Sequence, residues 1–414
     1  MKYYIIAGEA SGDLHGSNLM KGLYAQDPDA QIRFWGGDLM TEVWRGWENN
    51  PSHLVGPSPC GQGGSTVFPT PPHLNTGLVR HFKEGAVMGF VEVLMKAKKL
   101  LDNVKFCKED ILAWKPDVVI LIDYPGFNFK IAEFAHKAGF KVFYYIAPKV
   151  WASREGRIKK LKQYVDKLYI VFPFEIPYFK SKGVDFIYKG NPLVDAIDFS
   201  QAANETKEDF FQRNGLENRP AIAMLAGSRK GEISTMMPVL VEFASKLRTI
   251  PQYADYQFIV AGAPSRTMAD YEKYLDPSDK GVRVIFGQTQ NIIRHSQAAV
   301  VNSGTASLET VLLGTPQVVG YISSPITIAI AKLIVKIKYI SLGNLIINRL
   351  AFKELIQNDC SSDSLVEEVR RLIEDKDYRE AMIADYNEIR EALGGKGASA
   401  AVAQSMLSVL QGKE

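Results

Sequence analysis

The chain opens with a hydrophobic segment that runs directly into a glycine-rich turn, residues 3–16, YYIIAGEASGDLHG. Aromatic and β-branched residues are typical of a buried strand, and the glycines that follow allow a tight turn into a helix. The same order recurs in the second half of the chain, where residues 221–232 read AIAMLAGSRKGE. Two segments of strand, glycine-rich turn and helix predict two Rossmann-like domains.

Further short hydrophobic runs alternate with helical stretches along the chain. They are expected to form strands at residues 117–122, 141–146, 168–171, 257–261, 282–285, 298–301 and 317–321. This alternation predicts parallel sheets, because parallel strands need long crossover connections that are usually helical. Residues 362–410 have apolar side chains at helical spacing. We therefore expect an α/β fold of two Rossmann-like domains, with C-terminal helices that return toward the first domain.

The boundary between the two domains is expected near residue 195, where the turn GNPLVD leads into a polar, helix-prone segment. We assign residues 1–194 to an N-terminal domain, 195–380 to a C-terminal domain and 381–414 to C-terminal helices. Residues 41–76 are rich in Pro, Gly, Ser and Asn, follow neither hydrophobic period and exceed the length of an ordinary loop. This segment is interpreted as a disordered insertion.

The composition is that of a folded protein. The 414 residues are 46% hydrophobic and 23% charged with a net charge of +3, so neither disorder nor the basic surface of a nucleic-acid binder is expected. The three cysteines lack the spacing of a zinc site or a disulfide scaffold and favour a reducing compartment. Lysines interrupt the most apolar tract, residues 326–336, well short of the ~20 residues that cross a membrane. No metal, cofactor or membrane-spanning helix is expected.

The turn at residues 8–16 is a candidate binding loop. Ser11, Gly12 and Asp13 lie where glycines let a ligand approach backbone amides at the start of a helix. Capping of that helix by Ser11 or Asp13 explains the same pattern equally well. His15, in the same turn, is either a base or a residue of the helix surface.

Asp123 is the candidate general base. It directly follows the strand at residues 117–122 and precedes the turn Pro125-Gly126. A carboxylate in this position lies at the carboxyl edge of the sheet, where ligands bind in open α/β sheets. The alternative is that Asp123 caps the helix that follows.

A loop in the second half suits a diphosphate. Gly227, Ser228 and Arg229 follow the strand at residues 221–225 and precede a helix. Arginine offers paired hydrogen bonds to phosphate oxygens, and the helix start adds backbone donors. The loop lacks the spacing of a P-loop, which argues against that class of nucleotide hydrolase. A capped helix start with solvated basic residues is the alternative.

A second loop of the same kind follows the strand at residues 298–301. Ser303, Gly304 and Thr305 form another helix start suited to an anion, and Glu309 falls about one turn further, where it could accept hydrogen bonds from ribose hydroxyls. Alternatively, Ser303 is a cap and Glu309 is solvated. Two phosphate-suited turns in one domain favour a nucleotide.

An apolar stretch at residues 86–95 is followed by Lys96, Lys98 and Lys99, and the tract near residue 330 is similarly interrupted by lysines. Apolar faces bordered by lysine suit a membrane surface, although core helices are the commoner explanation.

Taken in order, the motifs of the chain resemble the lipid-A-disaccharide synthase family. They are GEASGDLHG (8–16), VMGFVEVL (87–94), IDYPGFN (122–128), PKVWASREGRIKKL (148–161), FPFE (172–175), GNPLVD (190–195), LAGSRKGE (225–232), NSGTASLE (302–309) and SLGNLIINRLAFKELIQ (341–357). No single motif is specific, but the ordered set covers nearly the whole chain. Ser153 and Lys353 differ from the residues usual in the family, which affects fine positioning rather than reaction type. Asn191 replaces a common His, so this position is not expected to be catalytic.

The resemblance implies the glycosyltransferase-B (GT-B) architecture, in which two Rossmann-like domains face a cleft. It implies an inverting transfer from UDP-2,3-diacylglucosamine to 2,3-diacylglucosamine 1-phosphate with release of UDP. Asp123 would deprotonate the acceptor hydroxyl, Arg229 and the turn at 303–305 would face the UDP phosphates, and Glu309 would face the ribose. Further substrate-binding positions implied by the family motifs are Met88, Glu92, Arg154, Arg157, Asn344, Glu354 and Gln357.

The resemblance also implies a cytoplasmic protein bound peripherally to the inner face of the membrane. A homodimer is left open, and the near-neutral charge predicts no nucleic-acid partner. A UDP-sugar 2-epimerase of similar architecture is the alternative among enzymes. A nucleotide-sugar-binding membrane protein without turnover would follow if the insertion blocked the cleft.

Overall fold

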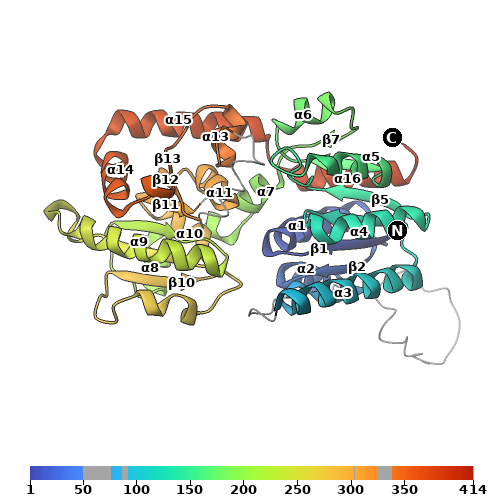
Figure 1. Cartoon of the computed structure of the whole chain (residues 1–414), viewed down its shortest axis with the longest axis horizontal. Helices are drawn as coiled ribbons and strands as arrows, with labels where there is room; N and C mark the ends of the chain where they lie inside the picture. Colours follow the sequence, from blue (N-terminus) through green and yellow to red (C-terminus); the bar gives the residue numbers. More distant parts are fainter. Residues whose placement is uncertain (50–75, 86–91, 303, 324–337, 414) are drawn as a thin grey trace, which may run out of the picture. The chain divides into compact units, whose positions relative to one another are not determined.

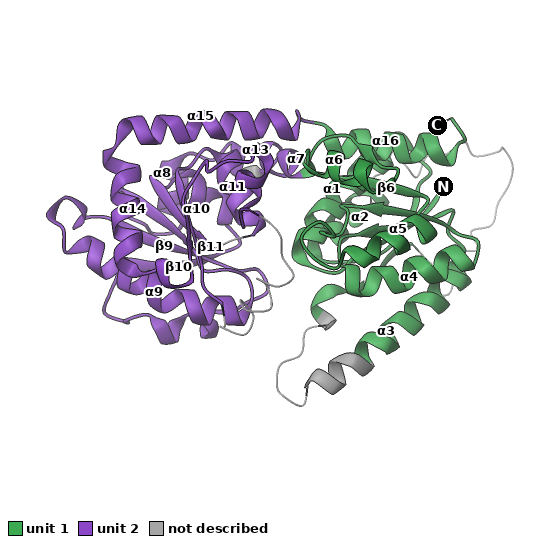
Figure 2. Ribbon diagram, turned by 45° about the horizontal axis from the view of Figure 1, so that its top comes forward, with its two compact units in different colours: residues 1–192, 397–414 green, residues 193–396 purple. Residues whose placement is uncertain are grey.

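The structure, a computed structural model, describes residues 1–49, 76–85, 92–302, 304–323 and 338–413 (Figure 1). The chain divides into two compact units (Figure 2). Unit 1 comprises Met1–Pro192 and Gly397–Glu414, and unit 2 comprises Leu193–Lys396. Each unit is built on one parallel β-sheet flanked by helices, which confirms the predicted α/β fold with two Rossmann-like parts.

Unit 1 contains a seven-stranded sheet with the order β3-β2-β1-β4-β5-β6-β7. The strands are β1 (Lys2–Ala7), β2 (Gln31–Gly36), β3 (Gly77–His81), β4 (Val118–Ile122), β5 (Lys141–Tyr145), β6 (Lys167–Ile170) and β7 (Ile187–Tyr188). The helices are α1 (Ala10–Gln26), α2 (Asp38–Glu48), α3 (Glu92–Trp114), α4 (Pro125–Lys137), α5 (Ile158–Tyr164), α6 (Glu175–Ser181) and α16 (Ala398–Leu410). The chain runs outward from β1 to β3 and then returns to the other side of β1 as β4. This reversal is a topological switch point, where ligands bind in open α/β sheets.

Unit 2 contains a six-stranded sheet with the order β10-β9-β8-β11-β12-β13. The strands are β8 (Ala221–Leu225), β9 (Gln257–Gly262), β10 (Val282–Phe286), β11 (Ala298–Asn302), β12 (Gln317–Tyr321) and β13 (Glu354–Ile356). The helices are α7 (Pro192–Asp198), α8 (Lys207–Arg213), α9 (Lys230–Arg248), α10 (Thr289–Arg294), α11 (Thr305–Leu313), α13 (Leu342–Ile347), α14 (Ser362–Glu374) and α15 (Lys376–Leu393). The equivalent switch point lies between β8 and β11.

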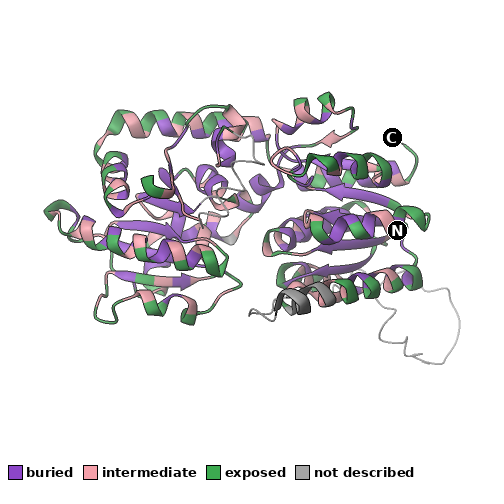
Figure 3. Cartoon of the chain, in the orientation of Figure 1, coloured by how far each residue is buried: buried purple, intermediate pink, exposed green. Residues whose placement is uncertain are grey.

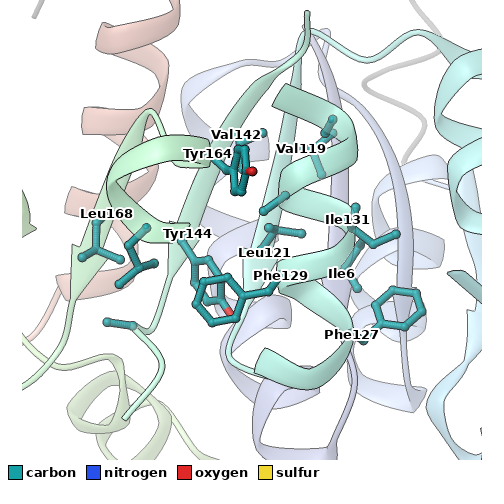
Figure 4. Packing of buried hydrophobic residues seen from close by; sticks show 14 of the residues in the cluster. Ile6, Val119, Leu121, Phe127, Phe129, Ile131, Val142, Tyr144, Tyr164 and Leu168 are labelled. Carbon is teal, nitrogen blue, oxygen red and sulfur yellow. The ribbon is translucent and has the colours of Figure 1, made fainter. Parts of the chain in front are cut away.

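The central strands are buried on both faces (Figure 3). Every residue of β4 and of β8 is buried, as expected for parallel strands covered by helices on both sides. In unit 1, Phe127 and Ile131 of α4 join Val119 and Leu121 of β4 in one hydrophobic cluster (Figure 4). This packing fixes the end of β4 and therefore the position of the residue that follows it, Asp123.

The C-terminal helix α16 belongs to unit 1, as the sequence predicted, whereas α14 and α15 remain in unit 2. Helix α16 packs closely on α1 at Gly22. A Cβ atom at Gly22 would lie 2.9 Å from the Cβ atom of Ala403 and 3.2 Å from the Cα atom of Ala400. The small residues on both helices therefore allow the close approach.

The interpretation of residues 41–76 as a disordered insertion is wrong for its first part, because Thr41–Glu48 belong to helix α2. The physical reason is tertiary: Asp13 accepts hydrogen bonds from backbone amides at the start of α2, and the Trp47 ring stacks on Tyr24 with centroids 4.4 Å apart. Neither contact can be read from the local sequence. The rest of the segment, residues 50–75, lies outside the described residues.

The two apolar stretches bordered by lysines are residues 86–95 and 326–336. Residues 86–91 and 324–337 lie outside the described part of the chain, so the structure says nothing about most of these stretches. Among the helices that the structure does describe, none is long and apolar enough to cross a membrane.

Candidate functional site

The loops that follow β1 and β4 meet at the switch point of unit 1. Gly8 leaves no room for a side chain, because a Cβ atom there would overlap the ring of Tyr124. Glu9, the next residue, is exposed and lies close enough to Asp123 to influence its ionisation. The structure therefore brings the glycine-rich turn and the candidate base together.

Asp123 lies in an unusual backbone conformation. Its φ is +42° and that of Tyr124 is +45°, so two consecutive residues other than glycine are left-handed. Such a conformation costs an L-residue roughly 1–2 kcal/mol. The carbonyl oxygen of Asp123 accepts hydrogen bonds from the Tyr144 hydroxyl at 2.6 Å and from Asn128 Nδ2 at 2.8 Å. These bonds stabilise the turn that presents Asp123.

The carboxylate of Asp123 is half-buried. Burial raises its pKa, repulsion from Glu9 raises it further, and the ammonium group of Lys149 opposes both effects. Among the described residues, no side chain donates a hydrogen bond to this carboxylate. A partly accessible carboxylate with a raised pKa is suited to accept a proton from a hydroxyl group.

The other predicted residues of the first turn differ in their surroundings. Ser11 is exposed, and Gly12 lets α1 approach β1, since a Cβ atom there would lie 3.2 Å from that of Ala7. Asp13 is buried and accepts hydrogen bonds from the amides of Gly37 at 2.7 Å, Leu39 at 3.0 Å and Met40 at 3.1 Å. Asp13 thus caps α2, and no side chain caps α1. Both oxygens of its carboxylate have protein partners.

Glu175, which begins α6 after β6, was not singled out from the sequence. It is fully buried and accepts hydrogen bonds from the amides of Val171 at 3.1 Å and Phe172 at 3.0 Å, and from Trp151 Nε1 at 3.1 Å. Burial raises the pKa of Glu175 to about 7, although these hydrogen bonds oppose the shift. Glu175 therefore ties the loop after β5, which carries Lys149, to the loop after β6.

Arg154 and Arg157 follow in the same loop after β5. Arg154 is exposed and left-handed with φ +59°, and the Arg157 guanidinium lies 5.5 Å from the centre of the Phe129 ring. Burial, together with repulsion from Arg154, lowers the pKa of Arg157. Met88 lies outside the described residues, and α3 begins at Glu92. The structure therefore adds no contact for those two predicted positions.

In unit 2, the loops after β8 and β11 meet at the switch point. Gly227 has φ +101°, and a Cβ atom there would lie 2.5 Å from Asn302 Nδ2 and 2.7 Å from Glu232 Oε2. Asn302 Nδ2 donates to the carbonyl of Ala226 at 3.1 Å. Only glycine fits at position 227, because both the conformation and the space exclude a side chain.

Glu232 occupies the backbone donors of the first loop. Its Oε2 atom accepts hydrogen bonds from the amides of Ser228 at 2.9 Å and Arg229 at 3.1 Å, and its Oε1 atom pairs with Arg229 Nη1 at 3.1 Å. Glutamate three residues after the cap position is the sequence signal of such a cap. The Arg229 side chain is 74% exposed, so its guanidinium group is accessible to a ligand.

The second loop leads into α11, which begins at Thr305 after Gly304; Ser303 lies outside the described residues. Glu309 of α11 is half-buried, and burial raises its pKa to about 7. No hydrogen bond to the Glu309 carboxylate occurs within the described part of the chain. This carboxylate is available to hydroxyl donors of a ligand.

The three predicted residues of the last motif have internal partners. Asn344 Nδ2 donates to the Phe352 carbonyl at 3.0 Å and to Glu354 Oε1 at 2.9 Å. Glu354 also accepts from the amides that precede α13. Gln357 exchanges two hydrogen bonds with the backbone of Ser323, at 2.7 and 3.0 Å. These residues shape the carboxyl edge of β12 and β13.

Comparison with known proteins gives consistent results. The family described as Lipid-A-disaccharide synthetase matches residues 74–408. The chain is 35% identical over 407 residues to the lipid-A-disaccharide synthase of Geobacter metallireducens, covering 98% of this chain and 96% of that protein. It is 33% identical over 408 residues to the enzyme of the same name from Trichlorobacter lovleyi, covering 98% and 97%.

Among solved structures, the UDP-GlcNAc 2-epimerase of Neisseria meningitidis bound to UDP-GlcNAc has a TM-score of 0.65 at 14% identity, covering 99% of this chain and 100% of that one. A likeness at this identity shows a shared fold alone. The family match and the relatives, by contrast, extend over most of the sequence. The chain belongs to the lipid-A-disaccharide synthase family.

Proposed function

We propose that this chain is an inverting glycosyltransferase of lipid A, and hence lipopolysaccharide, biosynthesis. It joins UDP-2,3-diacylglucosamine to 2,3-diacylglucosamine 1-phosphate and releases UDP. Family membership over nearly the whole chain supports the reaction. The observation that carries the assignment of residues is Asp123, a half-buried carboxylate at the switch point of unit 1 with a raised pKa.

In this proposal Asp123 takes the proton of the acceptor 6-hydroxyl as that oxygen attacks C1 of the donor sugar. The new bond forms on the face opposite UDP, the bond from C1 to the UDP oxygen breaks, and its electrons pass to the diphosphate. Arg229 and the start of α11 would stabilise the diphosphate charge, and Glu309 would accept hydrogen bonds from the ribose. Ser11, Arg154 and Arg157 are then assigned to the acceptor, whereas Gly12 is buried against β1.

The reaction is tested with the purified chain and both acylated substrates. Mass spectrometry should detect the disaccharide 1-phosphate, and release of UDP should require the acylated acceptor. A 2-epimerised UDP-sugar formed without acceptor would identify an epimerase instead. Binding of UDP-sugar without either product would identify a binding protein.

We also propose that the chain acts as a peripheral protein on the inner face of the cytoplasmic membrane. Both substrates carry acyl chains, and the apolar stretch at residues 86–95 is followed by Lys96, Lys98 and Lys99. Replacing these three lysines with alanine should weaken binding to anionic vesicles at low salt, and the difference should shrink as salt screens the charges. Binding that is independent of salt and of these lysines would contradict an electrostatic contribution.

A further inference from the structure

The turn between β4 and α4 is held by donors from two separate elements. Asn128 of α4 donates through Nδ2 to the carbonyls of Ile122 at 3.2 Å and Asp123 at 2.8 Å. Tyr144 of β5 donates its hydroxyl to the same Asp123 carbonyl at 2.6 Å. Both donor residues are fully buried. The carbonyl of Asp123 is therefore fixed from a helix and from a neighbouring strand.

These donors act on a backbone whose conformation costs free energy. Asp123 and Tyr124 are both left-handed, a conformation that glycine adopts freely and other residues rarely adopt. Glycines at these positions would allow the same turn, but they would remove the carboxylate. Two buried donors on the carbonyl of residue 123 hold the turn and so fix the position of the carboxylate that it presents.

The rest of the turn is equally constrained. The amide of Asp123 donates to the Tyr145 carbonyl at 3.2 Å, and the Tyr124 ring fills the space beside Gly8. The Tyr124 ring also stacks on Phe127 with centroids 5.6 Å apart. Backbone hydrogen bonding, ring packing and side-chain donors thus all restrain Asp123 and Tyr124.

We propose that Asn128 and Tyr144 are positioning residues for the transfer reaction, which hold the Asp123 carbonyl and thereby the orientation of its carboxylate. The inference rests on the proposed function, because it takes Asp123 to be the base. Neither residue touches the reacting atoms. Their effect on turnover therefore passes through Asp123 alone.

A double-mutant cycle tests this dependence. Tyr144→Phe keeps the ring packing and removes only the hydroxyl donor, and Asn128→Ala removes the amide donor. Each should lower kcat roughly 10-fold and leave the KM for the UDP-sugar unchanged, since loss of one buried hydrogen bond to a strained turn misplaces the base. In an Asp123→Asn background, neither change should lower kcat further.

Tyr3→Phe is the matched control. Tyr3 is equally buried in the same sheet and donates its hydroxyl to Asp27 at 3.0 Å, at the opposite end of β1. The Tyr3→Phe variant should lose about as much thermal stability as Tyr144→Phe, but its kcat should stay at the wild-type value. Thermal unfolding of each variant checks that it is folded.

The outcomes separate the two hypotheses. Equal losses of kcat in the wild-type and Asp123→Asn backgrounds, or no loss from Tyr144→Phe, would overturn the positioning role while leaving the base assignment intact. Unchanged kcat in Asp123→Asn alone would overturn the base assignment, and the positioning role would be refuted with it.

Discussion

The backbone and the chemistry at position 123 place separate demands on the residue. Glycine, asparagine and aspartate tolerate the left-handed φ of +42°, whereas a base must be a carboxylate. Asp123→Asn therefore separates the two, because asparagine keeps the conformation and cannot accept the proton. We expect kcat to fall by about 10²–10⁴, the usual contribution of a positioned base, with UDP affinity unchanged. Steady-state kinetics and calorimetric titration with UDP measure both quantities.

Glu9→Gln is a matched control for this prediction, since it removes a neighbouring carboxylate that raises the pKa of Asp123. It should shift the acid limb of the pH-rate profile downward without removing activity. Unchanged turnover in Asp123→Asn would transfer the role of base to His15 or another group.

Glu175 provides a pH-dependent contribution to stability. Its pKa in the folded protein is about 7, above the ordinary value of 4.5. Between these two values the folded protein holds a proton that the unfolded chain has lost, so the free energy of unfolding should fall as pH rises from about 4.5 to 7. The part of this decrease that belongs to Glu175 is on the order of 3 kcal/mol, and Glu175→Gln should remove that part while the contribution of Glu309 remains. Urea unfolding at pH 5 and pH 8 measures the difference.

A suitable control is Glu242→Gln, because Glu242 is exposed and its pKa is lowered through its hydrogen bond to Lys246. This variant should keep the decrease in stability between pH 5 and pH 8. A Glu175→Gln protein with the wild-type pH dependence would show that Glu175 titrates normally.

At the scale of elements, α2 depends on a residue outside itself. Asp13 of α1 receives three backbone hydrogen bonds at the start of α2 and is 3% exposed. Asp13→Ala leaves these donors unsatisfied in a buried place and should destabilise the protein by about 2 kcal/mol or more. Asp375→Ala removes a cap that receives one amide bond, from Tyr378 at 3.0 Å, and should cost only about 1 kcal/mol. Equal losses in urea unfolding would contradict the structural role of Asp13.

Some strands cannot be predicted from the local hydrophobic pattern of the sequence, because they depend on residues far away in the chain. Strand β2 contains Arg33, which is buried because it pairs with Asp110 of α3 through bonds of 2.6 and 2.9 Å. A charged residue at that position argues against a buried strand unless the distant partner is known. Strands β7 and β13 have only two and three residues and form through pairing with β6 and β12. By contrast, hydrophobic runs such as β4 and β8 were predicted nearly to the residue.

The candidate site residues of the whole molecule also divide into those that the local sequence reveals and those that depend on distant partners. Asp123, Gly227 and Arg229 could be found because each follows a predictable strand at a switch point. Glu232 carries a local signal, its place at the third position of helix α9. Glu175 also has local partners, the amides of Val171 and Phe172, but its bond to Trp151, 24 residues away, is brought about only by the fold. Sequence pattern therefore predicts which loops lie at the switch points, whereas the contacts that hold those loops required the structure.

The described residues on either side of positions 50–75 lie close together. Thr76 donates its hydroxyl to the Glu48 carboxylate at 2.9 Å, so a short Gly-Ser linker can replace residues 50–75 without moving α2 or β3. We expect kcat to remain unchanged and stability to rise by up to about 1–2 kcal/mol, because a shorter loop costs less entropy to close. Deleting residues 41–76 instead should abolish folding, since it removes α2 with the Asp13 cap and the Trp47–Tyr24 stacking. If the shorter deletion left a folded protein without activity, residues 50–75 would have to contribute to catalysis directly, and the assignment of chemistry to the strand-end loops would be incomplete.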